Sequence, residues 1–321
     1  MNILCGAGHV SAMTFSRRPL SLFVAAVMAL ASPAWAAPGD KALEDVRILS
    51  ADDMQGRGVG SPGSEKARAY ILSRFAEIGL SPAGASFEQG FDFTRRDGST
   101  VRGVNLVALI KGSKAGKAMV VTAHYDHLGL RNGETYNGAD DNASGVAGLL
   151  AVAEAFKANP PTHEVILAVV DAEESGLRGA RAFVAAPPVP LETITLNVNF
   201  DMLSKNAKNE LYAAGASPHP ALRPILESVA ATAPVSLKLG HDTDADGAHN
   251  NWTNQSDHYA FAEKGVPWVY FGVEDHAEYH KPVDDFATIP QDFFKRSIAT
   301  VVQASLALER GLDSLAPPAR P

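Results

Sequence analysis

Apolar and polar residues alternate in blocks along most of this chain. Three runs are almost wholly apolar and of strand length, at 118–123, 164–171 and 266–273, and 194–200 is also expected to be a strand. Apolar runs of this length are typical of strands that are buried on both faces of a parallel sheet. Two further runs, 104–110 and 210–213, are additional strand candidates.

Between the strand candidates, apolar residues recur at the spacing of a helix. The stretch 61–79 has this pattern and ends at Gly79, a residue that suits a helix C-cap. Further helices are expected at 145–157, 179–186, 219–232 and 291–310. We interpret residues 37–47 as a tether that leads into a helix. The alternation of strands and helices predicts an α/β fold, a three-layer sandwich with a mostly parallel central β-sheet flanked by helices.

The first 36 residues follow a different pattern. Arg17 and Arg18 precede an apolar run at 19–31, and an Ala-Trp-Ala cleavage site ends at Ala36. This pattern predicts that residues 1–36 are a secretory signal peptide, because the apolar run is too short for a comfortable transmembrane helix. The paired arginines also fit a twin-arginine signal, although an ordinary export signal is favoured. We therefore expect a periplasmic or secreted protein that has no membrane association once the signal is removed.

Composition narrows the function classes. The chain has 321 residues, 46% hydrophobic and 20% charged, as in an ordinary globular enzyme. Its only cysteine, Cys5, lies in the predicted signal, so residues 37–321 contain no disulfide and no thiol. The net charge is −8, and removal of the signal makes it more negative, which disfavours nucleic acid as a partner. No linker divides residues 37–321, which are expected to form a single catalytic domain.

Five potential metal ligands lie at the ends of strand-like runs or in the loops after them. They are His124, Asp141, Glu174, Asp201 and His280. Two imidazoles and three carboxylates suit a pair of zinc ions, provided that one carboxylate bridges both ions. Because ligands bind at the carboxyl ends of parallel strands, we expect one shared site. Glu173 adjoins one of these ligands and can move protons, so the set predicts metal-assisted hydrolysis.

Some of these residues also have simpler explanations. The segment around His124 can be a polar turn, although Asp126 can orient that imidazole through its carboxylate or its backbone. The segment around Asp141 can be a helix N-cap, for which Asn142 or Ser144 would serve, but capping needs only one polar side chain. Near the C-terminal candidate ligand, His276 is an alternative to His280 as the metal-binding histidine.

Taken together and in order, six motifs resemble the co-catalytic zinc aminopeptidase family, which also contains glutamate carboxypeptidases and glutaminyl cyclases. The motifs are HYDHLG, NGADDNASG, AEESGLRGA, NFDM, SDHYAF and YHKPVDD, and the resemblance covers about residues 45–310. It implies a zinc exopeptidase-like fold and two zinc ions per chain. One ion would be held by His124 and Asp201 and the other by Glu174 and His280, with Asp141 as the bridge.

The same resemblance assigns further roles. Glu173 would be the general base that activates a hydroxide held by the two zinc ions, and Asp126 would support His124 from behind. The bond that follows Asp141 would be a cis peptide. A segment that lines the substrate pocket in the family corresponds here to Asp257, His258 and Tyr259.

The implied activity is that of an aminopeptidase acting on peptides with a free N-terminus. A glutaminyl-peptide cyclotransferase and a dipeptidase or carboxypeptidase are the alternatives, and a non-catalytic ectodomain is disfavoured because all five ligands are present. Many relatives carry an inserted protease-associated domain. Here only about 25 residues, from Gly79 to Val104, occupy that position, which is too few for a domain.

Overall fold

The computed structural model describes residues 38–315, together with Met1 and Asn2, and the account below is confined to them. Apart from those two residues, the predicted signal peptide lies outside the described part of the chain.

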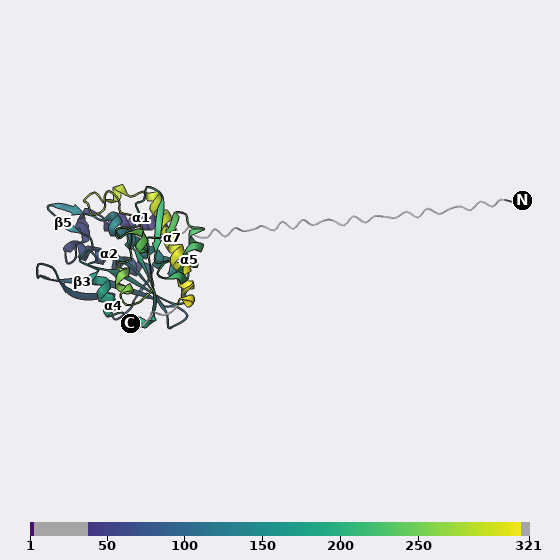
Figure 1. The fold of residues 1–321 in the computed structure, drawn as a ribbon, viewed down its shortest axis with the longest axis horizontal. Coiled ribbons are helices and arrows are strands. Elements are labelled where there is room, and N and C mark those ends of the chain that lie inside the picture. The colour runs from purple at the N-terminus through teal and green to yellow at the C-terminus, as the bar shows by residue number, and fades with distance from the viewer. Residues whose placement is uncertain (3–37, 316–321) are drawn as a thin grey trace. The chain divides into compact units, whose positions relative to one another are not determined.

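A nine-stranded mixed sheet forms the centre of the fold (Figure 1). Its four middle strands run parallel and are, in spatial order, β7 (Glu164–Val170), β4 (Ala118–His124), β8 (Ile194–Phe200) and β11 (Trp268–Gly272). On the other side of β7, β3 (Thr100–Ile110) pairs antiparallel with β7. Two further strands, β1 (Ser81–Pro82) and β2 (Glu88–Thr94), pair antiparallel with β3. Beside β11 lie antiparallel β9 (Glu210–Ala214) and then β10 (Ser236–Leu239). A separate hairpin pairs β5 (Gly129–Arg131) with β6 (Glu134–Tyr136).

Helices cover both faces of the sheet. The larger layer contains α1 (Pro38–Leu49), α2 (Pro62–Ile78), α3 (Gly145–Ala158), α5 (Arg223–Ala230) and α7 (Gln291–Arg310). The smaller layer contains α4 (Arg178–Ala185) and α6 (His258–Ala262). Successive residues of a strand point to opposite faces, so Met119 and Val121 pack in the larger core while Ala118 and Val120 pack in the smaller one. The predicted three-layer α/β fold is therefore confirmed.

The interpretation of residues 37–47 as a tether is wrong. Residues 38–49 form α1, whose Val46 and Leu49 are fully buried against the larger core. The C-cap at Gly79 is present, with φ at +75°, in the left-handed region that glycine favours. The helix expected over 219–232 is shorter, because a 3-10 turn at Pro220–Leu222 precedes α5.

The segment between Gly79 and Val104 belongs to the sheet. It supplies β1, β2 and the start of β3, and alternate residues of β2 are exposed, as befits a strand with one solvent face. In the described part of the chain, no helix combines the length and the apolar character of a membrane span.

Candidate metal centre

The predicted ligands meet at the carboxyl ends of the parallel strands. β4 ends at His124, Glu173 and Glu174 follow β7, and Asp201 follows β8 directly. The loop after β11 supplies His280. One cavity of about 480 Å³ is lined by all six predicted ligand and base residues, namely His124, Asp141, Glu173, Glu174, Asp201 and His280.

A first group of ligand atoms gathers around His124. Its Nε2 lies 3.3 Å from Asp201 Oδ1 and 3.5 Å from Asp141 Oδ1, and all three side chains are buried. Two ligands of one tetrahedral zinc ion lie about 3.3 Å apart, given metal–ligand distances of about 2.0–2.1 Å. The hydroxyl of Ser256 donates to the other oxygen of Asp201 at 2.6 Å. These three atoms therefore fit one zinc site, and Ser256 fixes the orientation of Asp201.

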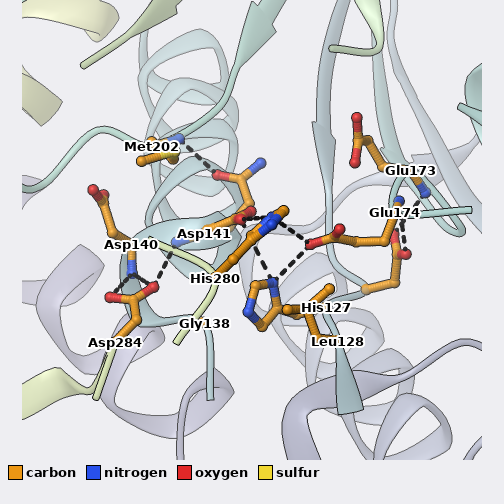
Figure 2. Close-up of polar contacts among 12 residues, drawn as sticks. His127, Leu128, Gly138, Asp140, Asp141, Glu173, Glu174, Met202, His280 and Asp284 are labelled. Atoms are coloured by element: carbon orange, nitrogen blue, oxygen red, sulfur yellow. Dashed lines mark hydrogen bonds and ion pairs between the residues drawn. The ribbon is translucent and has the colours of Figure 1, made fainter. Parts of the chain in front are cut away.

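A second group gathers on the other side of Asp141 (Figure 2). Nε2 of His280 lies 3.1 Å from Asp141 Oδ2 and 3.4 Å from Glu174 Oε1. Oε1 of Glu174 is buried and has no hydrogen-bond donor among the described residues, and a cation would satisfy it. Because Asp141 presents one oxygen to each group, its carboxylate is placed to bridge two ions.

Hydrogen bonds to neighbouring side chains fix the backbone around Asp141. The carboxylate of Asp284 accepts the amide N–H of both Asp140 and Asp141 at 3.1 Å (Figure 2). The Asp141–Asn142 peptide bond is cis, as the family resemblance implies. The side-chain oxygen of Asn142 accepts the amide N–H of Gly145 at 2.9 Å, which ties this segment to the start of α3.

His276, the alternative to His280 as a ligand, binds Asp140, the acidic residue next to Asp141. Asp140 is fully buried and lies 3.0 Å from Nε2 of His276. It also accepts a hydrogen bond from the hydroxyl of Ser204 at 2.7 Å. Burial opposes ionisation of Asp140, but these partners outweigh it and lower the pKa of the carboxyl. His276 is thereby engaged outside the cluster, and His280 is the histidine that faces Asp141.

Asp126 supports two parts of the site at once. Its backbone carbonyl lies 3.1 Å from Nδ1 of His124, which leaves Nε2 of that ring facing the carboxylates. Its carboxylate instead accepts the amide N–H groups of Glu173 and Glu174, at 3.0 and 3.4 Å. Of the two ways in which Asp126 was expected to meet His124, the hydrogen bond uses the backbone.

Glu173 lies in the cavity wall, and its carboxylate takes no part in the contacts around Asp141 (Figure 2). Burial raises the pKa of Glu173 well above its usual value, and the neighbouring carboxylates of Asp257 and Asp201 add to the effect while His124 opposes it. A carboxyl group with a raised pKa is suited to accept a proton and to return it.

The three residues of the predicted pocket segment differ in position. Only Tyr259 lines the cavity, whereas Asp257 and His258 are fully buried behind it. Burial raises the pKa of Asp257 to about 7, and neither of its carboxylate oxygens has a donor among the described residues. Nε2 of His258 donates to the carbonyl of Trp252 at 2.9 Å.

Sequence reasoning does not single out three features of the site. Besides the predicted Tyr259, aromatic and apolar side chains form much of the cavity wall, and they are Leu177, Met202, Trp252, Tyr270, Val273 and Tyr279. Arg57 is fully buried beneath the carboxylates, and burial lowers its pKa to about 10, so it remains charged at neutral pH. His127 is buried beside Glu174. The available signal is the spacing of His124 and His127, since His127 follows the last residue of β4 by three positions.

Residues 105–305 match the model of peptidase family M28. The chain belongs to this family. The M28 match covers the segment that carries every predicted ligand, so the expected membership of a zinc peptidase family is confirmed.

Two curated relatives of this M28 chain are similar over part of their length. The alkaline phosphatase isozyme conversion protein of Escherichia coli is 30% identical over 159 residues, which cover 44% of this chain and 45% of that protein. Leucine aminopeptidase 2 of Trichophyton equinum is 29% identical over 168 residues, covering 51% of this chain and 32% of that protein. The match therefore spans less than half the length of either relative.

Solved structures share the M28 fold. Porphyromonas gingivalis glutaminyl cyclase superposes with a TM-score of 0.69 at 19% identity, covering 83% of this chain and 97% of that chain. BSAP, a zinc aminopeptidase from Bacillus subtilis, gives a TM-score of 0.69 at 16% identity, covering 83% and 94%. At these identities the likeness shows the fold alone.

Proposed function

We propose that this protein is an exported zinc-dependent aminopeptidase that hydrolyses N-terminal residues from peptides. One observation carries the proposal: a single cavity places Asp141 between two pairs of ligand atoms, with Glu173 in its wall. The ligand types and their spacing suit zinc, and the chain belongs to a family of zinc peptidases.

The proposed centre holds two zinc ions per chain. One ion would be bound by His124 and Asp201, the other by Glu174 and His280, and both by Asp141. Zinc bound at such a site lowers the pKa of water to about 7 and polarises a carbonyl group.

Glu173 performs the proton transfers in this proposal. It takes a proton from the water that attacks the scissile carbonyl and returns it to the leaving amine. Its raised pKa, caused mainly by burial, suits both steps, because the protonated form persists long enough to donate. The backbone N–H of Glu173 is held by Asp126, which fixes where the carboxylate enters the cavity.

The cavity favours a substrate with a free amine. Glu173 and Asp275 both line it, and such carboxylates attract an ammonium group, while the aromatic wall accepts an apolar side chain. Arg181 is the only arginine or lysine among the lining residues, and its guanidinium is paired with Glu263 at 2.5 Å. Recognition of a substrate carboxylate, which a carboxypeptidase or dipeptidase needs, would require breaking that pair.

Glutaminyl-peptide cyclotransferase is the second candidate. It is favoured by the likeness to Porphyromonas gingivalis glutaminyl cyclase, which is as close in TM-score as the likeness to the Bacillus subtilis aminopeptidase. The relatives named leucine aminopeptidase 2 favour the peptidase. Peptides that begin with glutamine separate the two candidates, because the peptidase releases glutamine whereas the cyclotransferase closes its ring and leaves the peptide intact.

Replacement of the proposed base tests the proposal. Glu173→Gln should lower kcat by about 10²–10⁴, the usual contribution of general base catalysis, with unchanged zinc content and far-UV circular dichroism. Glu263→Gln, which removes the ion-pair partner of the lining residue Arg181, is the matched control and should remain active. A fully active Glu173→Gln enzyme would contradict the assigned role.

Export is tested separately. Expression of the full chain in a bacterial host should yield protein outside the cytoplasm whose intact mass corresponds to a start at Ala37, because cleavage is expected after Ala36. Uncleaved protein confined to the cytoplasm would contradict this part of the proposal.

A further inference from the structure

His127 is a buried histidine that has no role in the proposal above. It lies in the loop after β4, its ring is 2% exposed, and neither ring nitrogen has a hydrogen-bond partner among the described residues. Burial of a polar ring without partners is unfavourable, and such groups in native proteins call for an explanation such as a bound ion.

The ring is directed at two of the proposed ligands (Figure 2). Nδ1 of His127 lies 2.9 Å from Glu174 Oε1 and 3.7 Å from Asp141 Oδ2. The closer pair is not aligned as a hydrogen bond, and Glu174 Oε1 also lacks a hydrogen-bond partner among the described residues. The approach is within ion-pair distance, and when the ring is neutral it is also the spacing of two ligands around a common cation.

The distances fit a tetrahedron. His280 Nε2 faces the same two oxygens, at 3.1 and 3.4 Å. The four distances from the two imidazoles to the two carboxylates thus scatter around the value of about 3.3 Å that separates ligands of a tetrahedral zinc ion. Three of these residues, His127, Asp141 and Glu174, present atoms within 4.8 Å of one another.

The chain also makes room for the ring. Gly138 has φ at +55°, and a Cβ at this position would lie 2.6 Å from Cγ and Cδ2 of His127. Any other residue at 138 would therefore displace the imidazole or strain the backbone. Such a Cβ would also lie 2.0 Å from the carbonyl oxygen of Asp141, so the close approach of both groups requires glycine at 138.

We propose that His127 is a fourth protein ligand of the metal bound by Asp141, Glu174 and His280. This inference rests on the metal centre of the proposed function. It makes the two metal sites unequal: the second is enclosed by four protein ligands, whereas the first, at His124, has three and keeps a position open. Closed sites of this kind are structural and retain their metal strongly, so the open position for substrate or water belongs to the first site.

Cadmium-113 NMR tests the inference on the intact mature protein. In protein loaded with ¹¹³Cd, ring C–H protons show scalar coupling to the metal only in histidines that bind it. We expect one ¹¹³Cd resonance to correlate with the ring of His124 and the other with the rings of both His127 and His280. A second resonance that correlates with one histidine alone would overturn the inference, whatever any variant does.

Two variants extend this test. His127→Phe should remove one set of correlations and weaken zinc retention at the second site against a chelator by more than about 100-fold, beyond the 10–100-fold effect of a residue that merely orients a ligand. His258→Phe, at a fully buried histidine behind the cavity, is the control and should leave both unchanged. If His127→Phe costs less than about 10-fold, His127 is not a ligand.

The outcomes for the two proposals are distinguishable. Wild-type protein that binds no metal would refute both the proposed function and this inference. Two bound metals with peptide cleavage, but only two coordinated histidines, would refute the inference alone.

Discussion

Two histidines, the fully buried His258 and the partly exposed His219, show how single residues respond to the interior of this protein. Burial lowers the pKa of His219 and of His258 to about 4. His219 packs edge-on against Trp268, and the ring of His258 lies 4.5 Å from the same indole. Both rings are therefore neutral in the folded protein over the range in which an unfolded histidine takes up a proton.

This difference predicts a loss of stability in mild acid. Below pH 6.5 the unfolded state binds more protons than the folded state, so the free energy of unfolding falls as the pH falls towards 4. At pH 5 each histidine contributes a loss of up to about 2 kcal/mol. Urea titrations at pH 7.5 and pH 5 measure it, and His219→Leu should lose less stability between these pH values than the wild type. An equal loss in the variant would show that His219 is not responsible.

At the scale of elements, Arg57 joins three segments beneath the site. Its guanidinium donates to the carbonyls of Leu49 at the end of α1, of Tyr125 after β4, and of Asn137 and Gly138 before Asp141, at distances of 2.6–2.9 Å. A planar guanidinium can reach these four oxygens together, whereas an ammonium group cannot.

Replacement of Arg57 should therefore damage both the fold and the centre. Arg57→Lys leaves buried carbonyls without donors, at about 1–3 kcal/mol each, so the free energy of unfolding should fall by about 3 kcal/mol or more. Zinc retention should weaken as well, because the segment before Asp141 is released. Denaturant unfolding and chelator competition measure the two effects. Arg102→Lys, at an exposed side chain near the start of β3, is the control, and equal stability of the two variants would contradict the role of Arg57.

The elements that can be predicted most directly from sequence are those whose residues form one continuous apolar run. Apolar runs such as 118–123 and 164–171 mark strands buried on both faces, and the candidate ligands His124 and Glu174 are predictable because they lie at or just after the ends of such runs. The half-exposed strand β2 and helix α1 lack such runs, since each buries only one side. His127 and Arg57 depend on contacts between distant segments, which no local pattern records.

At the scale of the whole molecule, the sheet gathers acidic groups into one cavity. Two candidate metal sites contain the carboxylates of Asp141, Glu174 and Asp201. The carboxylates of Glu173 and Asp257 lie near these sites. Mutual repulsion of so many buried carboxylates opposes folding unless cations neutralise it.

Removal of metal should therefore destabilise the protein. A ligand at 1,000 times its Kd adds about 4 kcal/mol to the free energy of unfolding, and a chain of this size shifts its Tm by about 2–4 °C per kcal/mol. We expect Tm to fall by about 8–16 °C after chelation and to recover when zinc is restored, as scanning calorimetry will show. An unchanged Tm would mean that the site binds no metal.

The most direct test of the central claim is metal content per chain, measured together with cleavage of a panel of aminoacyl and N-acetylated chromogenic substrates and a peptide that begins with glutamine. The account predicts two zinc ions, cleavage that requires a free amine, and loss of cleavage on chelation. One zinc ion, or ring closure of the glutamine peptide without cleavage of any substrate, would contradict it and favour the cyclotransferase.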